Sequence, residues 1–322
     1  MVAVTGPIGV FVGLTTVDLI HRVAHAPGAN EKLTALRRDL AAGGPAANAA
    51  VTFSALGGRA ILITALGRGA VADVARSDLQ SHGVEVADFA PASESLAISA
   101  VTVVDSTGDR SVVSMDANAA AAELSSVIAG SGDFASVLSG QLSRADVLLI
   151  DGHYPQVAAA ACVAAQSRGL RAVLDAGRWK PQFQILLPLV SDVVCSADFR
   201  LPGVDPERTA ITILGMGASA VAITHGGDPI EWWTPEASGS VAVPQVRAVD
   251  TLGAGDVFHG AYAFFRTDAS LDVPQRLARA AQVAAVRTSV AGPRSWLSAL
   301  AGSRSHLPPE NRHRNDHYSP HS

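Results

Sequence analysis

The sequence is short of lysine and cysteine, and each shortage excludes a kind of site. Its two lysines, Lys32 and Lys180, are not followed by serine or threonine, so a GxxxxGK(S/T) phosphate-binding loop cannot occur. Its two cysteines, Cys162 and Cys195, lie far apart and form neither a disulfide framework nor a CxxC metal pair. If this protein binds ATP, it does so without the lysine of that loop.

Positive charge is not in excess either. The 24 basic residues are outnumbered by 29 acidic ones, and the net charge of −5 excludes the broad basic face of a nucleic-acid-binding protein. The apolar N-terminus is interrupted by Gly6, Pro7 and Asp18, so we expect neither a signal peptide nor a membrane span, and a cytoplasmic location. Residues 303–322 contain four histidines and three prolines; we expect a disordered tail, with metal binding as the alternative.

Hydrophobic residues make up 48% of the chain, which is enough for a large core. Short runs of Val, Ile and Leu alternate with Ala-rich segments, a pattern typical of a parallel sheet covered by helices on both faces. The expected strands are Val10–Leu14, Ala60–Ala65, Val147–Ile150, Ala172–Asp175, Asp192–Cys195 and Ala220–Thr224. The expected helices are Ala46–Ala55, Ala70–Ser81, Gln156–Ser167, Gly255–Phe265 and Gln275–Val290.

One region departs from this alternation. Leu96–Val104 and Arg110–Met115 flank a short polar turn, which predicts an antiparallel hairpin. Together with Asp18–Val23 and Lys32–Asp39, the hairpin could form a small sheet beside the main one. Such a sheet would act as a lid over a cleft; the alternative is a plain hairpin at the edge of the main sheet.

The segment Val249–Gly260 carries the sharpest local signal. Gly253, Ala254 and Gly255 place bare backbone amides at the start of a helix, where the helix dipole favours an anion such as phosphate. Asp256 follows them directly. It could cap the helix, or it could act as a base beside the anion site and accept a proton from a hydroxyl.

A second glycine segment, Gly43–Ala50, leads into a helix of small residues. Paired glycines allow a ligand or another backbone to approach closely. Asn48 is a poor helix former, and it could bond a substrate hydroxyl or a neighbouring backbone group. Glycine patterns at Gly67 and Gly215 are weak evidence for a dinucleotide site. Gly67 does not follow the first strand of the chain, and the Gly215 pattern runs into a strand instead of a helix.

Taken together, Gly43–Ala50 and Asp250–Asp256 resemble the two signatures of ribokinase-like (PfkB) carbohydrate kinases, and most closely the ketohexokinase and sulfofructose kinase branch. The resemblance covers about residues 8–298. It implies an α/β fold, a ribokinase-like three-layer α/β/α sandwich that is Rossmann-like and mostly parallel, with a small β-sheet lid. The kinase domain would span 1–302, and the lid would come from about 16–42 and 96–116.

The resemblance also implies roles for residues. Asp256 would be the catalytic base, and the amides of Gly253, Ala254 and Gly255 would hold the transferring phosphoryl group. The residues implied to bind a sugar are Asp18, Asn30, Gly43, Gly44, Asn48, Asp116 and Asn118. Those implied to bind the nucleotide are Thr224, Gly226, Gly227, Thr251, Gly253 and Gly255.

The implied cofactors are ATP and Mg²⁺, with K⁺ in some members. Asp250 and the Ser289–Gly292 loop resemble the monovalent-cation site. Many members carry an N-x-x-E motif for magnesium, but this chain has Ser196–Phe199 there, so Asp198 or Asp175 would have to substitute. Partners would be a sugar and ATP, with no nucleic acid or membrane, and lid strands could pair in a homodimer.

Two other functions stay open. A nucleoside kinase of the same family would need an aromatic platform, for which Phe11, Phe53, Tyr154 and Trp179 are available. A non-catalytic sugar-sensing homologue would not need the GAGD segment. An arginine at the cleft would favour a phosphorylated or sulfonated sugar; the candidates are Arg22, Arg37, Arg38, Arg110 and Arg178.

Overall fold

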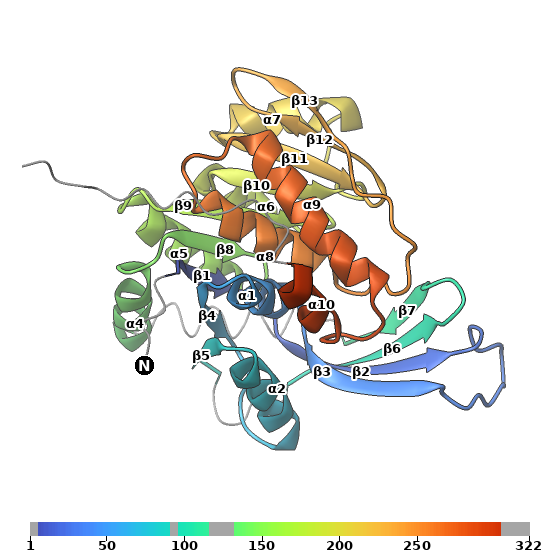
Figure 1. The fold of residues 1–322 in the computed structure, drawn as a ribbon. Helices are drawn as coiled ribbons and strands as arrows, with labels where there is room; N and C mark the ends of the chain where they lie inside the picture. Colours follow the sequence, from blue (N-terminus) through green and yellow to red (C-terminus); the bar gives the residue numbers. More distant parts are fainter. Residues whose placement is uncertain (1–5, 91–95, 116–131, 304–322) are drawn as a thin grey trace, which may run out of the picture.

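A computed structural model describes residues 6–90, 96–115 and 132–303 of the chain. These residues form a large sheet, a smaller sheet beside it, and helices on both faces of the large one (Figure 1). In this part of the chain, no helix is long and apolar enough to cross a membrane. The expected tail from residue 304 onward lies outside the described residues, as do Asp116 and Asn118.

The large sheet has nine strands in the order β13-β12-β11-β10-β9-β8-β1-β4-β5. Seven are parallel: β1 (Ile8–Val12), β4 (Arg59–Thr64), β5 (Val84–Asp88), β8 (Val147–Ile150), β9 (Arg171–Ala176), β10 (Asp192–Ser196) and β11 (Ala220–His225). Two antiparallel strands, β12 (Asp228–Trp233) and β13 (Ser238–Val241), extend one edge. All six expected strands are confirmed; β5, β12 and β13 were not expected.

Alternate residues of these strands point into two cores, so the fold has three layers, as expected. On one face lie α1 (Pro45–Ala55), α2 (Ala70–Ser81), α8 (Ala254–Arg266), α9 (Val273–Ser289) and α10 (Trp296–Ser303). On the other lie α4 (Gly132–Leu142), α5 (Pro155–Gln166), α6 (Phe183–Leu186) and α7 (Thr209–Gly215), with 3₁₀ turns at Leu187–Leu189 and Pro206–Arg208. The five expected helices are all present, with ends shifted by two residues at most.

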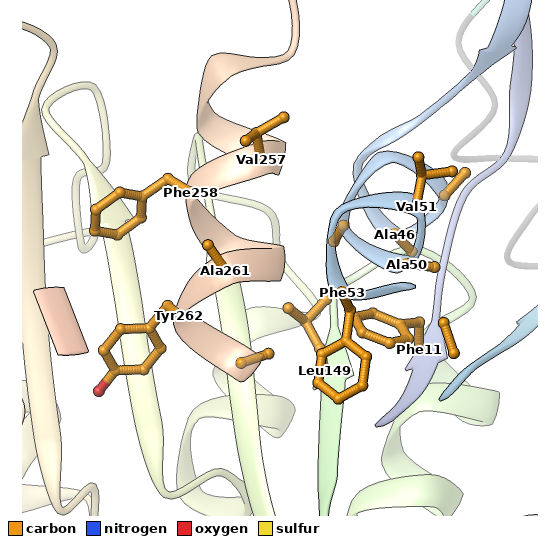
Figure 2. Packing of buried hydrophobic residues seen from close by; sticks show 14 of the residues in the cluster. Phe11, Ala46, Ala50, Val51, Phe53, Leu149, Val257, Phe258, Ala261 and Tyr262 are labelled. Atoms are coloured by element: carbon orange, nitrogen blue, oxygen red, sulfur yellow. The ribbon is translucent and has the colours of Figure 1, made fainter. Parts of the chain in front are cut away.

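Small residues let α1 and α8 pack at close range. A Cβ at Gly260 would overlap the backbone oxygen of Ala49, and four alanines of α1 are fully buried. Below them, the Phe11 and Phe53 rings pack edge to face beside Leu149 (Figure 2), with their centroids 5.3 Å apart. This packing brings the first turns of the two helices, and so Asn48 and Asp256, to the same place.

The smaller sheet has four strands in the order β3-β2-β6-β7. They are β2 (Thr16–Val23), β3 (Arg37–Gly43), β6 (Ile98–Val104) and β7 (Arg110–Val113). The expected hairpin is confirmed as the antiparallel pair β6–β7, and it belongs to this sheet and not to an edge of the large one. The strand expected at Lys32–Asp39 begins only at Arg37 and continues to Gly43.

Candidate active site

The head of α8 is not capped by Asp256. Gly253 is the N-cap residue, with a positive φ of 69° and no side-chain cap, and Asp256 is the third residue of the helix. The Asp256 carboxylate instead accepts a 2.8 Å hydrogen bond from Asn48 Nδ2 of α1. The capping interpretation of Asp256 is therefore wrong, and its carboxylate is held by a side chain from another helix.

Two cavities meet at this helix terminus. Gly253 lines the smaller cavity, whereas Ala254 and Gly255 line the larger one. Gly255 is exposed, and a Cβ built on it would have no atom within 4 Å. Ala254 N donates to the Thr251 carbonyl at 3.3 Å, but the first amides of a helix have no partner within the helix, so this terminus offers N–H groups and a partial positive charge between the two cavities.

Arg294 fixes the orientation of Asn48. Its Nη1 donates to Asn48 Oδ1 at 3.1 Å, so the Asn48 amide must turn its Nδ2 toward Asp256. Its Nη2 donates to Asp78 Oδ2 at 2.9 Å and to the Ala42 carbonyl at 2.7 Å. Sequence analysis missed Arg294 and Asp78, although Arg294 is only two residues beyond the 289–292 loop.

The smaller cavity brings together two of the seven residues expected to hold a sugar, Asp18 and Asn48. Its volume is about 20 Å³, and Asp18, Asn48, Gly253 and Arg294 line it. Burial raises the pKa of Asp18, even though Thr16 Oγ1 donates to its carboxylate at 2.8 Å, and the charge of Asp256 raises this pKa further. The charge of Asp256 therefore reaches Asp18, which lines this cavity.

The two expected glycines, Gly43 and Gly44, do not line this cavity, but each is required for a steric reason. A Cβ at Gly43 would overlap the Asp18 carboxylate, so only glycine leaves Asp18 in place. Gly44 has a φ of 96°, and a Cβ there would overlap the Leu14 carbonyl oxygen.

The larger cavity, about 550 Å³ in volume, collects the residues expected to bind a nucleotide. Among its lining residues are Thr224, Gly226, Gly227, Thr251 and Gly255. Its far wall comes from α9, where Ala281, Ala284, Ala285 and Thr288 follow one another at helical spacing and leave room for a flat ligand. Sequence analysis missed this wall; the run of small residues along one face of the expected helix was the available signal.

The two carboxylates considered for magnesium differ in exposure. Asp198 lines the larger cavity with 71% of its side chain exposed, 3.9 Å from Arg178 Nε. Asp175 is buried, which raises its pKa to about 6 despite the charge of His259, whose Nδ1 lies 3.3 Å away. Across the described residues, no three His, Cys, Asp or Glu side chains form a metal-binding group. A single exposed carboxylate suits an ion that brings its own phosphate and water ligands, as Mg²⁺ does.

Other expected residues lie elsewhere. Asn30 is exposed, with a φ of 59°, in the loop between β2 and β3, and is not brought to the cavity-lining residues. Of the five arginines considered, Arg110 lines the larger cavity and donates to Thr251 Oγ1 at 2.9 Å. Arg22 is buried against Asp105 and Asp250, Arg37 pairs with Asp39, and Arg38 and Arg178 are exposed.

The chain matches the family described as pfkB family carbohydrate kinase over residues 9–299. An ATP-dependent ribose-1-phosphate kinase of Halopiger xanaduensis is 28% identical to it over 88% of this chain and 93% of its own length. The ribokinase of Bacillus subtilis is 23% identical over 78% of this chain and 83% of its own length.

Solved structures agree with the fold. A putative ribokinase from Agrobacterium tumefaciens superposes with a TM-score of 0.80 at 24% identity. The match covers 95% of this chain and 100% of that protein's chain. An Arabidopsis thaliana ribokinase complexed with ribose and ATP superposes with a TM-score of 0.70, at 20% identity, over 92% of this chain and 98% of its own. Both similarities show the fold.

Proposed function

The chain belongs to the pfkB family of carbohydrate kinases, and from that premise we propose that it transfers the γ-phosphoryl group of ATP to a hydroxyl of a small sugar. One observation carries the proposal: the head of α8 opens on two cavities, through Gly253 on one side and Gly255 on the other. A donor in the larger cavity and an acceptor in the smaller one would therefore meet at the same amides.

Asp256 is the general base of the proposed reaction. Its Oδ2 is held by Asn48, which leaves the other carboxylate oxygen to accept the proton of the sugar hydroxyl. While the phosphoryl group is transferred, negative charge spreads over its oxygens, and the amides at 253–256 stabilise that charge. Phosphoryl transfer needs this positioning and charge stabilisation more than covalent chemistry.

ATP occupies the larger cavity in this proposal. The alanine wall of α9 takes the base, and Gly226 and Gly227 leave the phosphates room to approach the backbone. Asp198 is the carboxylate there that would meet Mg²⁺, which arrives with ATP and neutralises phosphate charge.

The sugar occupies the smaller cavity, where Asp18 and Asn48 would bond its hydroxyls. Two of the residues that line this cavity, Asp18 and Ala42, lie on the smaller sheet, so in this proposal that sheet closes over the sugar and excludes water as a lid. Arg287 and Arg294 line this cavity but already pair with Asp250 and Asp78. A neutral sugar therefore suits the site better than an anionic one.

A nucleoside acceptor has less support. Phe11, Phe53 and Tyr154 are buried in the two cores, and Trp179 packs against Phe183 and Phe199. None of these four lines the described part of the smaller cavity. A sugar-sensing homologue without catalysis would not need the carboxylate of Asp256 beside the amides, which favours the kinase.

The proposed reaction is tested by coupled detection of ADP with a panel of acceptors: free pentoses and hexoses, ribose 1-phosphate, and nucleosides. We expect ADP release with at least one neutral sugar and with no nucleoside. Release with a nucleoside alone contradicts the sugar proposal, and sugar binding with no ADP release from any acceptor supports the sensing alternative.

The nucleotide site is tested in the same assay with Ala284→Leu. Leucine at this position of the α9 wall fills part of the larger cavity. We therefore expect the KM for ATP to rise by about tenfold or more, with the KM for the sugar unchanged. Ala299→Leu on α10, away from the residues that line the larger cavity, is the matched control. An unchanged KM for ATP contradicts this placement.

We also propose a homodimer formed through the smaller sheet. Leu40, Leu19, Ala100 and Val113 are paired in register across all four strands and form one apolar row, with Leu40 52% and Val113 73% exposed. A second copy of this row is a partner of matching chemistry, because monomers rarely expose such continuous apolar surface. A cytoplasmic location stays an expectation, in keeping with the use of ATP.

Sedimentation velocity tests the dimer. We expect the wild type to sediment as a dimer and Leu40→Asp to sediment as a monomer, because a buried, unpaired carboxylate is costly at an interface. Ile185→Asp, at an apolar residue of α6 that is 65% exposed, is the control and should stay dimeric. A monomeric wild type, or a dimeric Leu40→Asp, contradicts this interface.

A further inference from the structure

The Arg287 guanidinium is surrounded by oxygens behind the turn that leads into α8. Its Nη1 donates to the carbonyls of Asp250 at 3.3 Å and Val290 at 3.1 Å, and its Nη2 lies 3.3 Å from Asp250 Oδ1. Both side chains are almost fully buried, with 3% of Arg287 and 2% of Asp250 exposed. One carboxylate and two carbonyl oxygens thus converge on a single positive charge.

Oxygens of this kind also suit a monovalent metal cation, since carbonyl and carboxylate oxygens can replace its hydration shell. At this site, however, they already bind a guanidinium. The second carboxylate oxygen of Asp250 accepts from Gly292 N at 2.9 Å and lies 3.5 Å from Arg22 Nη2. A metal cation would meet two guanidinium groups at one carboxylate, so the residues present do not fit the K⁺ expected from sequence.

We propose that Arg287 takes the place of a monovalent cation in this chain, so that its activity does not depend on K⁺. The catalytic part of this inference rests on the proposed kinase function. Arg287 holds the Asp250 carbonyl, and Asp250 Oδ1 accepts from Leu252 N at 3.1 Å, so the guanidinium fixes the turn that ends at the N-cap Gly253. Arginine stays charged and is covalently attached, so the amides of α8 keep their positions whatever salt is present.

The wild-type protein gives the first test. Its thermal unfolding and its kcat/KM are measured in KCl, NaCl and choline chloride at equal ionic strength, with Mg²⁺ held constant. We expect the same Tm and the same kcat/KM in all three salts. A higher Tm or a several-fold higher kcat/KM in KCl alone overturns the proposal. Unfolding needs no substrate, so this result stands even if no acceptor is phosphorylated, an outcome that would contradict only the kinase function.

Arg287→Ala gives the second test, because it frees the oxygens that the guanidinium binds. In choline chloride we expect kcat to fall by about tenfold or more, and K⁺ or guanidinium chloride at low concentration to restore part of it and to raise Tm. Arg279→Ala, on the same helix against the Phe265 ring, is the matched control and should respond to neither cation. If alanine prevents folding, Arg287→Gln is measured instead. Full activity of the variant in choline chloride, or a loss that neither cation reverses, overturns the proposal.

Discussion

Replacing Asp256 with asparagine is expected to lower kcat by about 10²–10⁴-fold, which is the usual contribution of a positioned general base. The amide keeps the size of the side chain, but it cannot accept the hydroxyl proton at neutral pH. Because Asp256 does not line the larger cavity, we expect the Kd for ATP to change little. Single-turnover phosphoryl transfer and a separate ATP titration measure the two quantities.

The matched control for this change is Asp73→Asn. Asp73 is also an acid in the first turn of a helix with a glycine N-cap, but it is exposed on α2. We expect it to leave kcat unchanged, which would separate the role of the base from any effect on the helix dipole. Full turnover of Asp256→Asn on the true acceptor would show that the carboxylate is not the base.

Local sequence signals predicted most of the fold. Apolar runs such as Val147–Ile150 are buried on both faces, so their composition identifies them as inner strands. The edge strand β13 carries exposed and polar residues such as Ser238 and Ser240, and β12 beside it begins with exposed Asp228, so their composition did not distinguish them from loops. Strand β5 alternates only weakly, with Glu85 exposed within it.

For the candidate site too, the sequence predicted the local features but not the contacts between distant residues. The glycines of the GAGD segment could be recognised because bare amides at a helix start are a local property of the chain. Asp250 and Arg287 are 37 positions apart, and Asn48 and Arg294 are 246 apart. No local pattern records such contacts, since they depend on how α1, α9 and the 289–292 loop pack together. That is why the expected K⁺ ligand proved to have arginine partners.

Replacing Arg294 with alanine is expected to lower both stability and turnover. Arg294 and Asp78 are 15% and 16% exposed, and removal of the guanidinium leaves the mostly buried Asp78 carboxylate with only Ala42 N and His82 as partners. We expect the free energy of unfolding to fall by about 2–3 kcal/mol, somewhat less than for a fully buried pair. We also expect kcat to fall by about 10–100-fold, because the Asn48 amide can then turn away from Asp256. Urea unfolding and steady-state kinetics measure the two effects.

Arg294→Lys separates positioning from stability. An ammonium group can still neutralise Asp78, but it cannot donate to Asp78, Ala42 and Asn48 with the geometry of a planar fork. We therefore expect lysine to restore most of the stability and little of kcat. Lysine that restores both would mean that Arg294 acts through folding alone.

Asn48→Ala tests whether Arg294 acts on Asp256 through the Asn48 amide. If Arg294 acts on the base only through Asn48, then the double variant Asn48→Ala/Arg294→Ala should lose no more kcat than Asn48→Ala alone. Additive losses would instead mean that Arg294 reaches the acceptor directly, which its position on the smaller cavity allows. The cycle thus decides whether this arginine orients the base or binds the substrate.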